Sequence, residues 1–209
     1  MLVQTIKAGA EEDKAQRDAV LSAALTIFSL EGFAGASVRQ IASLAKCNHA
    51  MIRYYFGTKD ALWKAAVEYL FEREKNEMNM ADGLSDALLR GERSAAEEWI
   101  RRYVAYCRRH PDHARIMVQA SIRNDEKLAW AANEFIRRKH GQVLPYIEAL
   151  MSTGVLPRCE SALNVGYILV AACQTMFMLA PEIEQLYGRQ DLKTHEERHA
   201  DAVVAMFLR

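Results

Sequence analysis

The sequence has few residues that interrupt helices. Its 209 residues include only 4 prolines and 10 glycines. The stretches between them are rich in Ala, Leu, Glu, Arg and Met, which favour helices. A hydrophobic fraction of 51% beside 26% charged residues excludes a disordered chain, because it supplies enough apolar surface for a packed core. The composition therefore predicts an all-α globular protein.

The chain has no excess of charge of either sign. Its 27 Lys and Arg residues balance 27 Asp and Glu residues, which gives a formal net charge of zero. This balance excludes nucleic-acid binding through a polybasic tail or a histone-like surface. It is compatible with a local basic patch, because net charge does not say where the charges lie.

Paired cysteines and an apolar leader are also lacking. The four cysteines, Cys47, Cys107, Cys159 and Cys173, are widely spaced and include no C-x-x-C pair. The N-terminal residues contain no apolar run of the signal-peptide type. We therefore expect reduced cysteines and a cytoplasmic location. For Cys47, packing as a small apolar residue is favoured over a redox role.

One long apolar run, residues 162–180, has to be compared with a membrane span. Asn164 and Gln174 interrupt it, and no basic cluster flanks it. These features favour a buried helix, and no membrane partner is expected.

Apolar spacing and capping residues predict about nine helices and no strand. Residues 1–12 are polar and are expected to be frayed, and the first helix ends at Gly32. Ser37 and Gln40 form a capping box for a short second helix. Asn48 is the expected N-cap of a third helix. Further along, the expected features are N-caps at Thr58, Ser94 and Thr194, a loop over 82–91, and one long helix over 125–151.

Residues 37–59 carry the strongest functional signal. Two short helices joined by a tight turn have the spacing of a helix-turn-helix. The stretch contains four basic residues, Arg39, Lys46, Arg53 and Lys59, and no acid. A local basic surface of this kind is what phosphate contacts require. A solvated helix face that happens to be basic is the alternative.

The third helix has one face suited to a major groove. Ile52, Tyr55 and Phe56 face inward by helical spacing, and His49, Ala50 and Arg53 share the opposite face with Tyr54 beside them. A small residue at position 50 allows close approach to bases. Arginine at position 53 can hydrogen-bond guanine in bidentate fashion.

Residues 20–63 resemble the DNA-binding domain of the TetR family of bacterial transcriptional regulators. The similarity is carried by ALTIF at 24–28, EGF at 31–33, SVRQIA at 37–42 and IRYYFGTKDALW at 52–63. The layout of the chain is also similar to that of the family. The resemblance implies a three-helix helix-turn-helix domain in residues 1–60, followed by a helical effector-binding and dimerisation domain in residues 61–209.

The resemblance also implies which residues contact DNA. Position 39 matches a base or phosphate contact, positions 49–51 and 53 match base contacts, and positions 54, 55, 59 and 37 match backbone contacts. The full set is Ser37, Arg39, Asn48, His49, Ala50, Met51, Arg53, Tyr54, Tyr55 and Lys59. The chain departs from the family pattern at Lys46–Cys47 in the turn, and at Arg53 and Tyr55. An operator sequence therefore cannot be transferred from the family.

Two further sets of residues in the C-terminal region follow from the same resemblance. An apolar effector pocket is expected from aromatic, sulfur-containing and amide side chains, with ordinary core packing as the alternative for each. These are Trp99, Tyr103, Tyr106, Met117, Gln119, Trp130, Phe135, Tyr146, Asn164, Tyr167, Gln174, Phe177 and Met178. A four-helix dimer interface is expected at Ala171, Ala172, Ala202, Val203, Met206 and Phe207.

A competing motif is H-E-x-x-H at residues 195–199, the pattern of a zinc protease. A capping box formed by Thr194 and Glu197 explains the same residues, and residues 200–209 offer only Asp201 as a third ligand. We expect no metal, no cofactor and no enzymatic activity.

The sequence thus predicts a homodimeric transcriptional repressor with an unknown small-molecule effector, which binds an imperfect palindrome in double-stranded DNA. The alternative is a helical ligand-binding or interaction protein without sequence-specific DNA binding.

Overall fold

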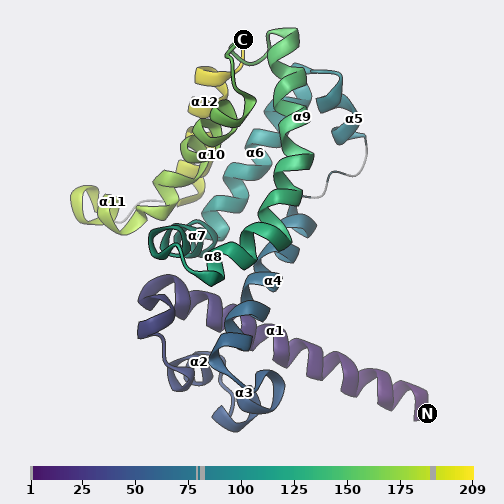
Figure 1. Ribbon diagram of the computed structural model, residues 1–209, viewed down its shortest axis with the longest axis vertical. Coiled ribbons are helices and arrows are strands. Elements are labelled where there is room, and N and C mark those ends of the chain that lie inside the picture. Colours follow the sequence, from purple (N-terminus) through teal and green to yellow (C-terminus); the bar gives the residue numbers. More distant parts are fainter. Residues whose placement is uncertain (1, 79, 81–82, 189–191) are drawn as a thin grey trace. The chain divides into compact units, whose positions relative to one another are not determined.

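Figure 1 shows the computed structural model of the protein, which describes residues 2–78, 80, 83–188 and 192–209. Within these ranges the chain forms the helices α1 to α12 and one π-helical turn, and it contains no strand. The prediction of an all-α fold is confirmed. The helices outnumber the nine expected, because helices also form at Leu84–Leu89 and Ala180–Tyr187, and the long helix expected over 125–151 is divided in two.

The chain divides into two compact units. The N-terminal unit contains residues 1–73 and 115–123, and the C-terminal unit contains residues 74–114 and 124–209. This division lies further along the chain than the expected border at residue 60. The difference arises because buried residues of helix α4 (Lys59–Glu77), such as Leu62, Val67 and Leu70, belong to the N-terminal unit.

Helix α1 (Leu2–Gly35) includes the residues expected to be frayed, and its backbone is helical from Leu2 onward. No proline interrupts it, so the helix propagates to the break expected at Gly32, where φ is 68° and ψ is 172°. By length and composition alone, residues 11–35 and the bent pair of helices α10 (Ala162–Met178) and α11 (Ala180–Tyr187) are apolar enough to cross a membrane. In α1 the apolar residues Leu21, Leu25 and Phe28 are instead buried in the protein core.

The next three helices begin where the capping residues predict. They are α2 (Val38–Leu44), α3 (His49–Phe56) and α4 (Lys59–Glu77). Thr58 accepts a hydrogen bond at its Oγ1 from the backbone N–H of Ala61, at 3.0 Å. The three N-terminal helices and their turn are therefore those expected from the sequence.

The C-terminal unit is built around α6, which packs against α5, α10 and α12 (Figure 1). Its helices are α5 (Leu84–Leu89), α6 (Arg93–Arg109), α7 (Pro111–Arg123, shared with the N-terminal unit), α8 (Glu126–Ala131), α9 (Arg137–Thr153), α10 (Ala162–Met178), α11 (Ala180–Tyr187) and α12 (Leu192–Phe207). A π-helical turn, Ala132–Ile136, joins α8 to α9. Leu88, Ile100, Val104, Ile147 and Leu150 lie at the centre of the core.

Four expectations for this unit are wrong. Helix α5 forms within residues 82–91, which were expected to be a loop. Helix α6 begins at Arg93 because Glu92 has the extended backbone of an N-cap, so Ser94 lies inside the helix. Helix α12 likewise begins before Thr194. The long helix expected over 125–151 is divided by the π-helical turn.

Candidate nucleic-acid interface

The start of α2 is fixed by a reciprocal capping box. The Oγ of Ser37 accepts a hydrogen bond from the backbone N–H of Arg39 at 3.2 Å, and the backbone N–H of Ser37 donates to Oε1 of Gln40 at 2.9 Å. The backbone amide of Ser37 is therefore already bonded within the protein. Only its hydroxyl proton is left to donate to a phosphate oxygen.

The turn between α2 and α3 is tight and is closed by the backbone. The N–H of Cys47 donates to the carbonyl of Ala42 at 3.0 Å, and Lys46 adopts a left-handed backbone with φ 52°. Glycine takes this conformation more easily than lysine. Asn48 then caps α3, since its Oδ1 accepts from the N–H of Ala50 at 2.8 Å. Asn48, expected as a DNA contact, therefore has a structural role at this atom.

Helix α3 presents the face that helical spacing indicates. Ile52 is 2% exposed and anchors the helix. On the opposite side His49, Ala50 and Arg53 are exposed. Tyr54 is 85% exposed, the highest value among the large hydrophobic side chains. An exposed helix face with one arginine and one small residue can approach base edges in a major groove.

The surface of this motif is positive. Arg39, Lys46 and Arg53 are exposed, Lys59 is half-buried, and residues 37–59 contain no acid. Lys59 lies at the start of α4, where its Nζ is 3.3 Å from the carbonyl oxygen of Ala34 and 4.9 Å from the centre of the Phe33 ring. These contacts hold its ammonium group at the edge of the motif.

Tyr55 differs from the other expected DNA contacts because its hydroxyl has a protein partner. It donates a hydrogen bond to the carboxylate of Asp13 in α1. This bond to Asp13 is the main reason why the pKa of Tyr55 is raised, and desolvation raises it further. This contact was not predicted from the sequence, because residues 1–12 were expected to be frayed and Asp13 directly follows them.

The aromatic residues expected to line an effector pocket fall into several groups in the C-terminal unit. The rings of Tyr103 and Tyr106 stack at 6.3 Å, and those of Trp99 and Tyr146 meet edge-on at 6.3 Å. The Tyr146 hydroxyl is 2.7 Å from Oγ of Ser85. Trp130 contacts Phe135, and Phe177 contacts His199. Gln174 and Met178 are half-buried.

An ion pair with a buried carboxylate adjoins the first of these groups. Glu74 is only 5% exposed, and its carboxylate pairs with the ammonium group of Lys139. Lys139 also lies 5.6 Å from the centre of the Tyr103 ring. Burial raises the pKa of Tyr103 well above its usual value, so this hydroxyl stays protonated.

Four of the expected pocket residues lie elsewhere. Met117 and Gln119 belong to the N-terminal unit. The Nε2 amide of Gln119 donates to the carbonyl of Ser29 at 2.9 Å. Asn164 is exposed and Tyr167 is 58% exposed, so both lie on the outer face of α10. The inference that Asn164 is a buried amide is therefore wrong, because an apolar helix does not reveal from its sequence which side faces solvent.

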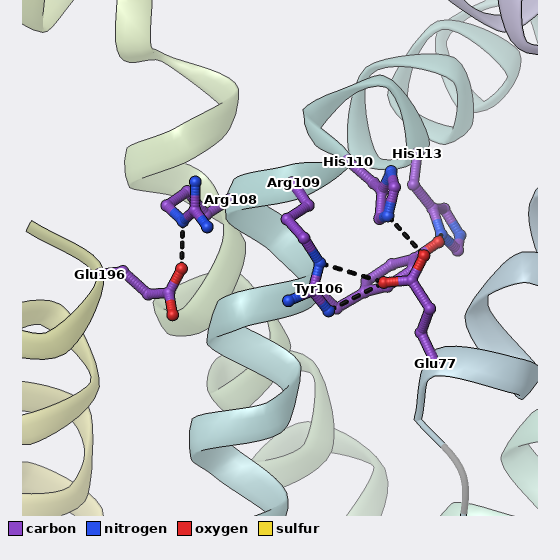
Figure 2. Close-up of polar contacts among 7 residues, drawn as sticks. All are labelled: Glu77, Tyr106, Arg108, Arg109, His110, His113 and Glu196. Atoms are coloured by element: carbon purple, nitrogen blue, oxygen red, sulfur yellow. Dashed lines mark hydrogen bonds and ion pairs between the residues drawn. The ribbon is translucent and has the colours of Figure 1, made fainter. Parts of the chain in front are cut away.

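Figure 2 shows polar contacts at the C-terminal end of α6. Glu77 accepts from Arg109 at 2.8 Å and lies 2.7 Å from Nε2 of His110. The buried Tyr106 hydroxyl is 2.9 Å from Nδ1 of His113. Partial burial alone would raise the pKa of Glu77, but the hydrogen bond from Arg109 and the charge of His110 outweigh it and lower the pKa.

The H-E-x-x-H residues hold helices together. Glu196 pairs with Arg108 of α6 (Figure 2), and Nε2 of His199 is 2.8 Å from the carbonyl oxygen of Ala172 in α10. Because α12 already includes position 194, the expected capping box is wrong as well. In the part of the chain that the structure describes, no three His, Cys, Asp or Glu side chains are placed to share a metal ion.

The expected dimer residues divide between core and surface. Val203 is 3% exposed, and Phe207 and Ala172 pack against the core. Ala171, Ala202 and Met206 are exposed, Met206 at 79%. Sequence reasoning missed further exposed apolar side chains, which are Leu163 and Ile168 on α10 and Leu186 and Tyr187 on α11. An exposed apolar face of this kind is typical of a protein interface.

Comparison with known proteins agrees with this geometry. Residues 20–66 match the family described as bacterial regulatory proteins, tetR family. The chain is 31% identical over 182 residues to the HTH-type transcriptional repressor NicS of Pseudomonas putida, a match that covers 81% of this chain and 80% of NicS. It is 41% identical over 58 residues to the HTH-type transcriptional regulator RutR of Escherichia coli, which covers 28% of this chain and 27% of RutR.

Solved structures share the fold. The Streptomyces coelicolor protein SCO4942 superposes with a TM-score of 0.60 at 18% identity, over 92% of this chain and 98% of that one. A mutant of HlyIIR superposes with a TM-score of 0.61 at 20% identity, over 93% of this chain and 98% of that one.

Proposed function

Because this chain belongs to the TetR family and is a DNA-binding transcriptional regulator, we propose that it acts in the cytoplasm as a homodimeric, ligand-responsive repressor. The observation that carries the proposal is the acid-free helix-turn-helix, whose α3 exposes His49, Ala50 and Arg53 beside a buried Ile52. In this proposal Arg53 contacts bases, and Arg39 and Lys59 contact the backbone.

Dimerisation is supported by the exposed apolar side chains of α10 and by Met206 of α12. Pairing of two chains through these helices would remove this surface from water. A symmetric dimer carries two reading helices related by a two-fold axis, so its operator is expected to be an imperfect palindrome.

Ligand response is supported by the aromatic groups of the C-terminal unit and by the pair of the buried Glu74 with Lys139. Such a combination provides apolar surface with a few fixed polar groups, as small-molecule sites do. A ligand lowers operator affinity only if it binds a conformation with low DNA affinity more tightly than it binds the DNA-binding conformation. A hundredfold loss of operator affinity requires about 2.7 kcal/mol of coupling.

The direct test is selection of genomic DNA fragments by the purified chain near physiological salt, followed by binding measurements with variants. We expect a palindromic motif whose preference is weakened by Arg53→Ala. Lys59→Ala should instead reduce the slope of log affinity against log salt concentration by the amount expected for about one phosphate contact. It should leave the preferred sequence unchanged. Lys75→Ala removes an exposed positive charge outside the helix-turn-helix and is the matched control.

Recovery of no preferred sequence would overturn the proposal. An interaction protein without sequence-specific DNA binding, the alternative considered from the sequence, would give that result. An unchanged motif with Arg53→Ala would instead show that another residue of α3 reads the bases.

A further inference from the structure

Two residues of α1 contact the last two residues of α3. The carboxylate of Asp13 accepts a hydrogen bond from the Tyr55 hydroxyl, and the guanidinium carbon of Arg17 lies 5.5 Å from the centre of the Phe56 ring. Asp13 and Arg17 are four residues apart, so they lie on the same face of α1. One turn of α1 therefore holds the C-terminal end of the reading helix.

This contact adds to the attachments that already hold α3, which are the backbone-closed turn after α2, the cap at Asn48 and the buried Ile52. The helix is eight residues long, and Ile52 is its only buried residue. The turn and the cap act at the N-terminal end of α3, and Ile52 acts near its middle, so these attachments restrain rotation of the C-terminal end less directly. A second attachment at the C-terminal end restrains this rotation, and with it the direction in which His49 and Arg53 point.

The hydrogen bond also decides what the Tyr55 hydroxyl can do. A tyrosine hydroxyl has one proton to donate, and phosphate oxygens accept hydrogen bonds from such groups. While the proton is donated to Asp13, it cannot also be donated to DNA. Tyr55 is therefore placed to position α3 and not to contact a phosphate through this proton.

We propose that Asp13 is a specificity-determining residue of the DNA interface, which acts through Tyr55 to fix the orientation of α3. The inference rests on the proposed function of the helix-turn-helix. The Asp13 carboxylate has two opposing effects on binding. Its charge weakens binding to any DNA, because phosphates repel it, whereas its bond to Tyr55 favours the operator over other sequences.

The test uses the full chain with two matched variants, Asp13→Ala and Glu12→Ala. Glu12 is the adjacent exposed acid of the same helix, so its removal changes the net charge equally but leaves the Asp13–Tyr55 bond in place. Affinity is measured for the selected operator and for a scrambled duplex of the same length and composition. Circular dichroism shows that both variants are folded.

We expect Glu12→Ala to strengthen binding to both duplexes by the same factor. The ratio of operator affinity to scrambled-duplex affinity should therefore be unchanged. Asp13→Ala should strengthen binding to the scrambled duplex to a similar extent but lower the ratio about fivefold. Tyr55→Phe should lower the ratio by a similar factor. The double variant should be no worse than either single variant, because both remove the same bond.

A spectroscopic readout separates this role from a general loss of stability. The hydrogen bond to Asp13 raises the pKa of the Tyr55 hydroxyl, so Asp13→Ala should lower this pKa in an NMR titration of labelled tyrosine. Glu12→Ala should leave it unchanged, and Asp13→Glu should restore both the titration and the affinity ratio.

Equal affinity ratios for Asp13→Ala and Glu12→Ala, with operator preference intact, would overturn this inference and leave the proposed function standing. Absence of operator preference in the unmodified chain would overturn the proposed function, and this inference with it.

Discussion

Gln119 of α7 and Ser29 of α1 are 90 residues apart in the sequence and are joined by a 2.9 Å hydrogen bond from amide nitrogen to backbone carbonyl oxygen. The bond lies beside the break in α1, because a Cβ atom added to Gly32 would be 3.3 Å from Oε1 of Gln119. The break in α1 and the second half of α7 therefore form one packed junction within the N-terminal unit.

Gly32→Ala should destabilise this junction. Gly32 has φ 68° and ψ 172°, a backbone region that is essentially restricted to glycine and costs an alanine about 1–3 kcal/mol, and the added methyl group would also press on Gln119. Gly141→Ala is the control, since Gly141 lies inside α9 with open space around its Cα and should gain up to about 1 kcal/mol. Urea denaturation measures both. Equal stability of the two variants would contradict the left-handed backbone at position 32.

Glu77 should make stability depend on pH at the acid end. Its pKa is lowered in the folded protein, so it contributes stability that is fully present above its unfolded value of 4.5 and is lost as pH falls through the folded value. Glu77→Gln should therefore be less stable at pH 7 and lose less stability on acidification. Glu72→Gln, at an exposed position of the same helix, is the control. Thermal denaturation at several pH values between about 3 and 7 measures how the stability of each variant depends on pH.

The exposed cysteine and the two buried cysteines should react at different rates with a thiol reagent. Cys159 is exposed, whereas burial raises the pKa of the Cys107 thiol to about 12 and also raises the pKa of Cys173. Because the thiolate is the reactive form, the two buried thiols should react at least about tenfold more slowly than Cys159. Mass spectrometry after brief alkylation of the native protein identifies the modified residues. Rapid labelling of Cys107 would show that α6 is accessible to solvent there.

Charges on the outer face of α10 and α12 should prevent dimerisation. Ile168→Asp and Met206→Asp place a carboxylate on side chains that are 58% and 79% exposed in the single chain, so neither should unfold it. Burying an unpaired charge in the interface should weaken dimerisation by at least about a hundredfold. Leu89→Asp, at an exposed apolar residue of α5, is the control. Sedimentation that shows a dimer for all three variants would place the interface elsewhere.

Local chemistry explains which parts of the site could be predicted. The caps at Ser37 and Asn48 depend on residues within three positions, so their hydrogen bonds follow from short sequence patterns. The exposed face of α3 follows from helical periodicity once Ile52 is taken as the buried residue.

Contacts between distant residues could not be predicted in this way. The Asp13–Tyr55 bond joins residues 42 positions apart, and it requires that α1 continue through a polar segment. Asn164 was expected in the pocket because α10 is apolar on all sides. Its apolar residues therefore do not indicate which face of the helix is buried. Ser94 was expected to be a cap, but the extended backbone at Glu92 starts the helix earlier.

The left-handed backbone of Lys46 sets stability against function at one position. Glycine there would relieve roughly 1 kcal/mol of strain, but it would also remove one of the four positive charges of residues 37–59. A library at position 46 screened for heat resistance should therefore be enriched in glycine. The same library selected for repression should keep lysine. The two screens would therefore select different residues at position 46.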